Sequence, residues 1–109
     1  MSGMFELKKS KGQFMWNLKA TNGKIILTSE RYKTRRAAEA GIASVKKNCS
    51  RDACFARKTT PSGKYRFNLL STNGQVIGSS QNYASSSGRN NGIRSVRQNA
   101  KGAKIADLI

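Results

Sequence analysis

Apolar and polar residues alternate along the first part of the chain, over residues 5–8 and again over residues 13–20. This period of two predicts two half-buried β-strands. A third strand is predicted over residues 24–29, and beyond it the spacing of apolar residues lengthens to that of a helix. The helix is expected to run from Arg35 to about Asn48, with Thr34 as its N-cap. The first half of the chain therefore predicts three strands followed by one helix.

The pair Asn22-Gly23 joins the second and third predicted strands. Asn-Gly between two β-prone runs is typical of a hairpin with a two-residue type I′ turn, because Asn and Gly tolerate positive φ. Such a turn fixes a register that sets Ala20 opposite Ile25, Leu18 opposite Leu27 and Trp16 opposite Ser29. The face that carries these apolar residues is predicted to be the core face, and Ile26 falls on the other face.

The same pattern returns at an offset of 51 residues. Residues 12–48 and 63–99 align without a gap and are identical at 14 of 37 positions. The second copy predicts strands over 55–58, 64–71 and 75–80, and a helix from a cap at Ser85 or Ser86 to about Asn99. The turn at 60–63 is one residue longer than its counterpart. The chain is therefore a tandem duplication of a β-β-β-α unit.

One unit of this size buries too little apolar surface to be stable alone, so both are expected in one α+β domain over residues 1–109. The first repeat is assigned to residues 4–49 and the second to 55–100; the tail at 101–109 is expected to dock on the body or to fray. The predicted architecture is one antiparallel six-stranded sheet with two helices packed on it. Gly41 and Gly92 recur inside the helices and indicate close approach of each helix to the sheet.

The spacing of these residues resembles the YegP-like family of small uncharacterised bacterial proteins, which includes a tandem subfamily. In the first repeat the residues that carry the resemblance are Phe5, Gly12, Trp16, Leu18, Asn22, Gly23, Ser29, Tyr32, Gly41, Ile42, Ser44 and Val45; their equivalents between Gly63 and Val96 carry it again. The resemblance implies that each helix is exchanged and packs on the other repeat's strands. It implies no reaction, no cofactor and no site residues.

The chain is strongly basic, with 21 Lys and Arg, 5 Asp and Glu, and a formal net charge of +16. A surplus of this size favours polyanionic partners, although it also serves solubility. Arg35 and Arg36 stand at a predicted helix N-terminus, where the helix dipole disfavours cations, so an external anion is an attractive interpretation. The candidate nucleic-acid-binding residues are Arg31, Lys33, Arg35, Arg36, Lys46, Lys47, Arg94, Arg97 and Lys101.

The aromatic residues bear on the kind of binding. Phe14, Trp16, Tyr65 and Phe67 lie on the predicted apolar strand face and are interpreted as core residues, not as a base-stacking platform. Any nucleic-acid binding is then expected to be weak and led by phosphate contacts. The alternative hypothesis is a homo-oligomeric or protein-interaction module without a nucleic-acid role, in which sheet edges and the pair Ile26 and Ile77 form a homodimer contact.

Catalysis is not expected. The chain has no His, its acids are scattered, and no glycine-rich phosphate loop is present. Cys49 and Cys54 have too few partners for a zinc site, so no metal or other cofactor is predicted, and without a signal sequence reduced thiols in a cytoplasm are expected. No apolar run approaches the length of a membrane span. The sequence therefore predicts a cytoplasmic, non-enzymatic protein.

Overall fold

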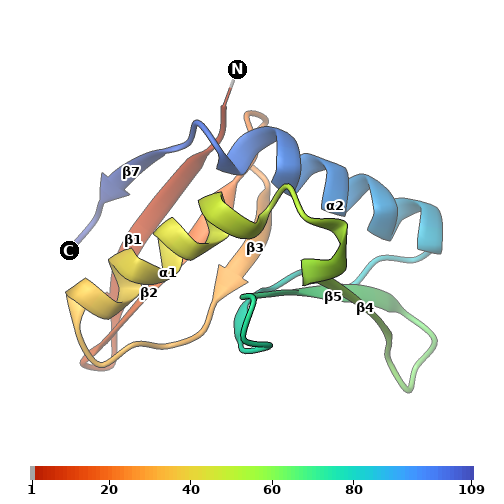
Figure 1. Ribbon diagram of the computed structural model, residues 1–109, viewed down its shortest axis with the longest axis horizontal. Coiled ribbons are helices and arrows are strands. Elements are labelled where there is room, and N and C mark those ends of the chain that lie inside the picture. The colour runs from red at the N-terminus through yellow and green to blue at the C-terminus, as the bar shows by residue number, and fades with distance from the viewer. Residues whose placement is uncertain (1) are drawn as a thin grey trace.

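The structure is a computed structural model that describes residues 2–109, and its elements follow the chain in two similar blocks (Figure 1). The first block contains β1 (Met4–Ser10), β2 (Gln13–Lys19), β3 (Ile25–Ser29) and α1 (Arg35–Asn48). A short 3-10 turn, η1 (Asp52–Cys54), leads into the second block, which contains β4 (Phe55–Thr59), β5 (Tyr65–Leu70), β6 (Val76–Ser79) and α2 (Ser86–Ala100). A last strand, β7 (Lys104–Asp107), follows α2. The predicted order of strands and helices is confirmed through residue 100.

The strands form one mostly antiparallel sheet in the order β4-β5-β6-β3-β2-β1-β7. The two repeats meet where β3 pairs with β6 at the centre, with Thr28 opposite Ser79. The prediction of six strands is wrong, because β7 pairs in parallel with β1 and adds a seventh. The N–H of Leu108 also donates to the carbonyl oxygen of Leu7 at 2.9 Å, so this part of the tail is held along the edge of the first repeat. A four-residue strand carries too little periodicity to be found from the sequence.

The turn at Asn22-Gly23 differs from its predicted type. Gly23 has φ +85°, but Asn22 does not have positive φ, and the N–H of Gly23 donates to the carbonyl oxygen of Ala20. This is the three-residue hairpin in which a type I turn precedes a left-handed glycine. The second repeat uses the same form, with Gly74 at φ +86°. Positive φ at two successive residues, as a type I′ turn requires, occurs instead in the β1–β2 turn.

The three-residue hairpin changes which face of the sheet Ile25 and Ile26 occupy. Leu18 pairs with Leu27 as predicted, but Lys19 pairs with Ile25, so β3 carries a bulge at Ile26. Ile26 is buried in the core cluster, whereas Ile25 is 40% exposed. The prediction that Ile25 lies in the core and Ile26 on the second face is therefore wrong. The same exchange occurs in the second repeat, where Val76 is exposed and Ile77 is buried.

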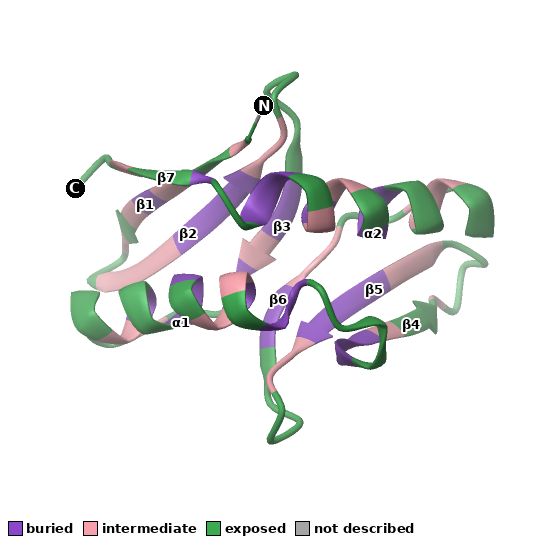
Figure 2. Ribbon diagram, turned by 45° about the horizontal axis from the view of Figure 1, so that its top comes forward, coloured by how far each residue is buried: buried purple, intermediate pink, exposed green. Residues whose placement is uncertain are grey.

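Both helices lie on one face of the sheet (Figures 1 and 2). Helix α1 contacts β2 of its own repeat and β5 and β6 of the other, and α2 contacts β5 of its own repeat and β1, β2 and β3 of the other. Each helix therefore contacts strands of both repeats, and the exchange of helices that the family resemblance implied is not confirmed. The two repeats share one core, consistent with a single α+β domain.

The core lies between the helices and the sheet, where the purple residues of Figure 2 gather. Its largest fully buried side chains are Trp16, Phe5 and Phe67. Phe5 packs edge-on against Trp16 with ring centroids 5.3 Å apart, and Phe55 packs on Phe67 in the same way at 5.7 Å. The interpretation of Trp16 and Phe67 as core residues is confirmed, whereas Phe14 and Tyr65 are only partly buried at its margin.

The glycines inside the helices permit contact with a tyrosine. A Cβ built on Gly41 would overlap the hydroxyl of Tyr32 and lie 2.9 Å from its Cζ, and one on Gly92 would meet Tyr83 in the same way. Each helix does make a close contact at its glycine, but the main partner is the tyrosine that precedes the helix and not, as predicted, the sheet.

Candidate nucleic-acid interface

The predicted basic cluster before α1 lies at the start of that helix. Thr34 is its N-cap, as predicted, and its Oγ1 accepts a hydrogen bond from the N–H of Ala37 at 3.1 Å. Arg31 donates to Ser10 Oγ at 3.2 Å, and Lys33 and Arg36 are exposed. Among residues 2–109 no carboxylate lies within 4.0 Å of the charged nitrogens of Lys33 or Arg36.

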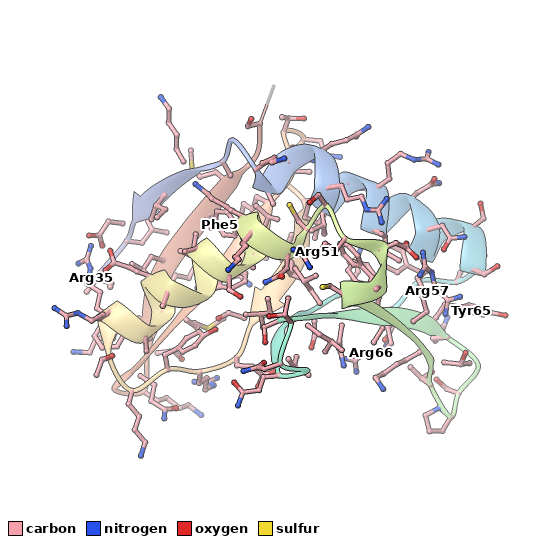
Figure 3. All side chains as sticks on the ribbon, in the orientation of Figure 1. Phe5, Arg35, Arg51, Arg57, Tyr65 and Arg66 are labelled. Carbon is pink, nitrogen blue, oxygen red and sulfur yellow. The ribbon has the colours of Figure 1, made fainter. Side chains whose placement is uncertain are left out.

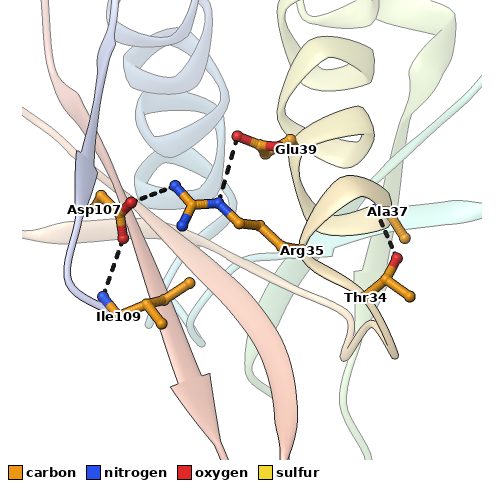
Figure 4. Close-up of polar contacts among 6 residues, drawn as sticks. All are labelled: Thr34, Arg35, Ala37, Glu39, Asp107 and Ile109. Atoms are coloured by element: carbon orange, nitrogen blue, oxygen red, sulfur yellow. Dashed lines mark hydrogen bonds and ion pairs between the residues drawn. The ribbon is translucent and has the colours of Figure 1, made fainter.

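Arg35 has carboxylate partners within the protein. Its guanidinium binds the carboxylate of Asp107 and lies 3.8 Å from Glu39 Oε2 (Figure 4). The hydrogen bond from Arg35 lowers the pKa of the Asp107 carboxyl, as does the N–H of Ile109, and the same bond to Asp107 raises the pKa of Arg35. An external anion is therefore not needed to explain the cation at Arg35, whereas Arg36 has no carboxylate within 4.0 Å among residues 2–109.

Lys46 and Arg97 occupy equivalent places in the two repeats and have equivalent partners. The ammonium of Lys46 lies over the ring of Phe5, 5.9 Å from its centroid, and the guanidinium of Arg97 lies over Phe55 at 5.4 Å. Arg97 also binds Asp52 Oδ1 at 3.0 Å. Both cations therefore help to cover the aromatic core, which is a structural role within the fold.

Arg57 is the second cation bound to Asp52, at 3.1 Å. Its hydrogen bond is the largest cause of the lowered pKa of the Asp52 carboxyl, and Arg97 adds to the effect. The connection before β4 is thus fixed to both the edge strand and α2 through one carboxylate.

The remaining predicted residues lie on the outer sides of the helices. Lys47 is exposed near the end of α1, Arg94 is exposed in the middle of α2, and Lys101 follows the last turn of α2. Arg36 and Lys47 are separated by three helical turns and so share one side of α1. We use the term helix-side cations for Arg36, Lys47, Arg51, Arg94 and Lys101, because each is exposed and has no carboxylate within 4.0 Å among residues 2–109.

Arg51 belongs to this set but was missed by the sequence prediction, which assigned it to a connection. It is exposed just beyond the end of α1, whereas Arg35 lies at the other end of the helix (Figure 3). A signal was present, because Arg51 is a further cation that follows Lys46 and Lys47 just beyond the predicted end of the helix. The cluster at Arg31 and Lys33 is separated from Lys47 by most of a helix about 20 Å long, so the nine predicted residues do not form one patch.

The two thiols lie in the connection between the repeats, where Cys49 is the C-cap of α1 and Cys54 is the last residue of η1. Cys49 and Cys54 are both free and buried, and burial raises the pKa of the Cys49 thiol. Within residues 2–109, His, Cys, Asp and Glu side chains form no group of three that is suited to a metal ion. None of the helices in that part of the chain is long and apolar enough to cross a membrane.

Comparisons with known proteins confirm the family resemblance. The family model described as a domain of unknown function, DUF1508, matches residues 9–55 and again residues 61–107. A UPF0339 protein of Bordetella pertussis is 51% identical over 107 residues, which cover 98% of this chain and 96% of the relative. UPF0339 protein YegP of Escherichia coli is 47% identical over 108 residues, which cover 98% of each chain.

Solved structures of similar proteins have the same fold. The solution NMR structure of yegP from E. coli, described as a protein of unknown function, superposes with a TM-score of 0.93 at 47% identity and covers 99% of this chain and 94% of that one. The solution NMR structure of a UPF0339 protein from Shewanella oneidensis gives the same TM-score and identity, and covers 99% and 92%. The chain therefore belongs to the DUF1508 family of YegP-like UPF0339 proteins, and it carries the domain twice in tandem.

Proposed function

We propose that the protein is a non-enzymatic cytoplasmic domain that binds nucleic acid weakly, through phosphate contacts made by the helix-side cations. The observation that carries the proposal is the small number of basic residues with an internal partner. The six ion pairs involve only Lys8, Lys19, Arg35, Arg57 and Arg97. Sixteen of the 21 basic residues therefore have no carboxylate within 4.0 Å among residues 2–109.

The buried aromatic rings support phosphate contacts over base contacts. Trp16 and Phe67 are fully buried, and the partly buried rings of Phe14 and Tyr65 each lie beneath a cation of the protein itself. Such rings are not free to stack on bases. The helices expose Arg, Lys, Asn and Gln side chains instead, which suit phosphate oxygens and discriminate poorly between sequences.

The test is a salt titration of binding to a labelled duplex and to a labelled single strand. We expect log K to fall linearly with log salt, with a slope of roughly −0.9 per phosphate contacted on duplex DNA. Replacing Arg36, Lys47, Arg94 and Lys101 by Gln should flatten this slope. The matched control replaces Lys11, Lys24, Lys64 and Lys104, which changes the net charge equally but lies in turns and on the edge strand.

Equal flattening by both sets of substitutions would contradict the assignment to the helices. Loss of all binding above about 100 mM salt, where screening acts within roughly 10 Å, would show that the charge serves solubility alone.

A second proposal, a homodimer, rests on the outer edge of the sheet. Edge strand β7 has only β1 as a neighbour, and Met4, Ile105, Leu108 and Ile109 around it are all more than 40% exposed. Antiparallel pairing of two β7 strands would set Lys104 opposite Asp107 of the second copy, which is a favourable pair of charges. Sedimentation equilibrium of the wild type and of Ile105→Lys tests this proposal, because the substitution should abolish the dimer. Ile26 and Ile77, which the sequence analysis placed in a homodimer contact, are both buried and so cannot form it.

A further inference from the structure

A pocket of about 310 Å³ lies where α1 of the first repeat meets the β5–β6 hairpin of the second. The first repeat lines it with Glu30, Tyr32 and Gly41, and the second with Gln75, Val76 and Ile77. This volume is near the lower limit for pockets that bind small molecules, and such pockets often lie between two structural units. The helix-side cations are not among the residues that line it.

Glu30 gives the pocket a negative charge that the protein does not neutralise. The other four acidic side chains, Glu6, Glu39, Asp52 and Asp107, all bind a Lys or Arg. Among residues 2–109, Glu30 is the one acidic side chain with no Lys or Arg nitrogen within 4.0 Å. Its carboxylate is exposed and therefore accessible to a cation from solution.

A buried hydrogen-bond donor lies behind the same wall of the pocket. Trp16 is fully buried, and within residues 2–109 its Nε1–H makes no hydrogen bond of ordinary geometry, although it lies close enough to the Tyr32 hydroxyl to lower the pKa of Tyr32. A Cβ built on Gly41 would lie 3.2 Å from this nitrogen and would overlap the Tyr32 hydroxyl, so the two polar groups are neighbours at the pocket wall. Because the indole and the Tyr32 hydroxyl are neighbours, the indole is sensitive to whatever contacts Tyr32 from the pocket.

The internal duplication supplies a comparison within the same chain. At the positions offset by 51 residues in the other repeat, Gln81 corresponds to Glu30, Phe67 corresponds to Trp16, and Lys24 of the first repeat corresponds to Gln75 of the second. Tyr83, the counterpart of Tyr32, stacks on Phe67 with centroids 6.4 Å apart. The second repeat thus keeps the fold without the carboxylate or the indole, so the fold itself does not require either group.

We propose that this pocket binds a small primary amine with an apolar body of about the size of one aromatic ring. The ammonium group would donate charge-assisted hydrogen bonds to the carboxylate of Glu30. The apolar body would lie against Val76, Ile77 and the ring of Tyr32. Burial, and then the charge of Glu30, raise the pKa of Tyr32, so its hydroxyl stays protonated near neutral pH.

Trp16 is the single tryptophan of the chain, so its indole N–H gives one resonance in a ¹H–¹⁵N correlation spectrum. The experiment titrates the full chain with 2-phenylethylamine at millimolar concentrations, and with 2-phenylethanol and phenylacetate as neutral and anionic probes of the same body. We expect the amine to shift the indole resonance and the backbone resonances of Gly41 and Gln75, and to bind at least about tenfold more tightly than either other probe.

The decisive variant is Glu30→Gln, which introduces the residue that the second repeat carries at the same position. It should weaken binding of the amine at least about tenfold while leaving binding of 2-phenylethanol unchanged. The matched control, Glu39→Gln, also removes one carboxylate but lies outside the pocket lining, and it should bind the amine as the wild type does. Equal binding of all three probes, unshifted resonances, or unchanged affinity in Glu30→Gln would each overturn the proposal.

Discussion

The carboxylate of Asp107 binds the guanidinium of Arg35, although the two residues are 72 positions apart in the chain. Asp107 is the last residue of β7 and Arg35 is the first of α1. The contact therefore joins the edge strand of the sheet to the start of the first helix. A cation at a helix N-terminus is disfavoured by the helix dipole, and the carboxylate from β7 offsets that effect.

The first prediction concerns the pH dependence of this contact. The pKa of the Asp107 carboxyl lies below its ordinary value of 3.8 in the folded protein, so the contact stabilises the fold above that pH. Asp107→Asn should lower the free energy of unfolding at neutral pH. The difference from the wild type should shrink as the pH falls through the lowered pKa, and should vanish below it. Urea unfolding at a series of pH values measures this.

Glu30→Gln is the charge control for Asp107→Asn, because it removes a carboxylate that forms no ion pair. Both variants raise the net charge equally, so any general increase in repulsion is shared. If the two variants lose stability alike at every pH, the contact with Arg35 contributes nothing of its own.

The second prediction concerns Gly41. Alanine is favoured over glycine in a helix by about 1 kcal/mol, yet Gly41→Ala should destabilise the protein. Gly41 is buried, its Cβ would overlap the Tyr32 hydroxyl, and overpacking of this kind costs roughly 1–3 kcal/mol. In a Tyr32→Phe background the loss should be smaller, since the overlapping oxygen is gone. Thermal unfolding of the four proteins in the cycle measures the coupling.

Gly88 offers the matched control in the other helix. A Cβ there would lie 3.4 Å from Ser85 Oγ and 3.6 Å from Tyr83, which is ordinary contact. Gly88→Ala should therefore stabilise the protein by about 0.5–1 kcal/mol. A stabilising Gly41→Ala would contradict the explanation given for the glycine.

Duplication made most of the fold predictable from the sequence. A pattern that occurs in both repeats is stronger evidence than one that occurs once. The contact between Tyr32 and Gly41, for example, recurs between Tyr83 and Gly92. The sequence predicted the turn at Asn22-Gly23 correctly but assigned it the wrong type. A two-residue and a three-residue hairpin use the same Asn-Gly pair in different positions, and the difference exchanges the environments of Ile25 and Ile26.

The binding residues were less predictable than the fold, because the sequence does not show which cations already have partners. Arg35 is bound by Asp107 from the far end of the chain, and Arg97 covers Phe55. Neither contact produces a periodic pattern in the sequence from which it could be predicted. Arg51 was overlooked for the opposite reason, since it lies in the connection after α1 and yet is exposed without a carboxylate partner among residues 2–109.

The third prediction concerns β7. Deletion of residues 104–109 makes β1 the edge strand, paired with β2 alone, and removes the contact to Arg35, so we expect a lower melting temperature and a greater tendency to aggregate. Leu108→Ser with Ile109→Ser changes only exposed side chains beyond the strand and should leave the melting temperature nearly unchanged. A deletion variant that melts like the wild type would show that β7 adds no stability.

The fourth prediction separates two arginines one turn apart on α2. Arg97 binds Asp52 and covers Phe55, whereas Arg94 is exposed and reaches only Asn91 Oδ1, at 3.4 Å within its own helix. Arg97→Gln should therefore cost stability on the order of 1 kcal/mol. Arg94→Gln should leave the melting temperature unchanged but weaken nucleic-acid binding and reduce the salt slope by about one contact. The two variants lose the same charge, so equal effects on binding and on stability would refute the distinction between structural and helix-side cations.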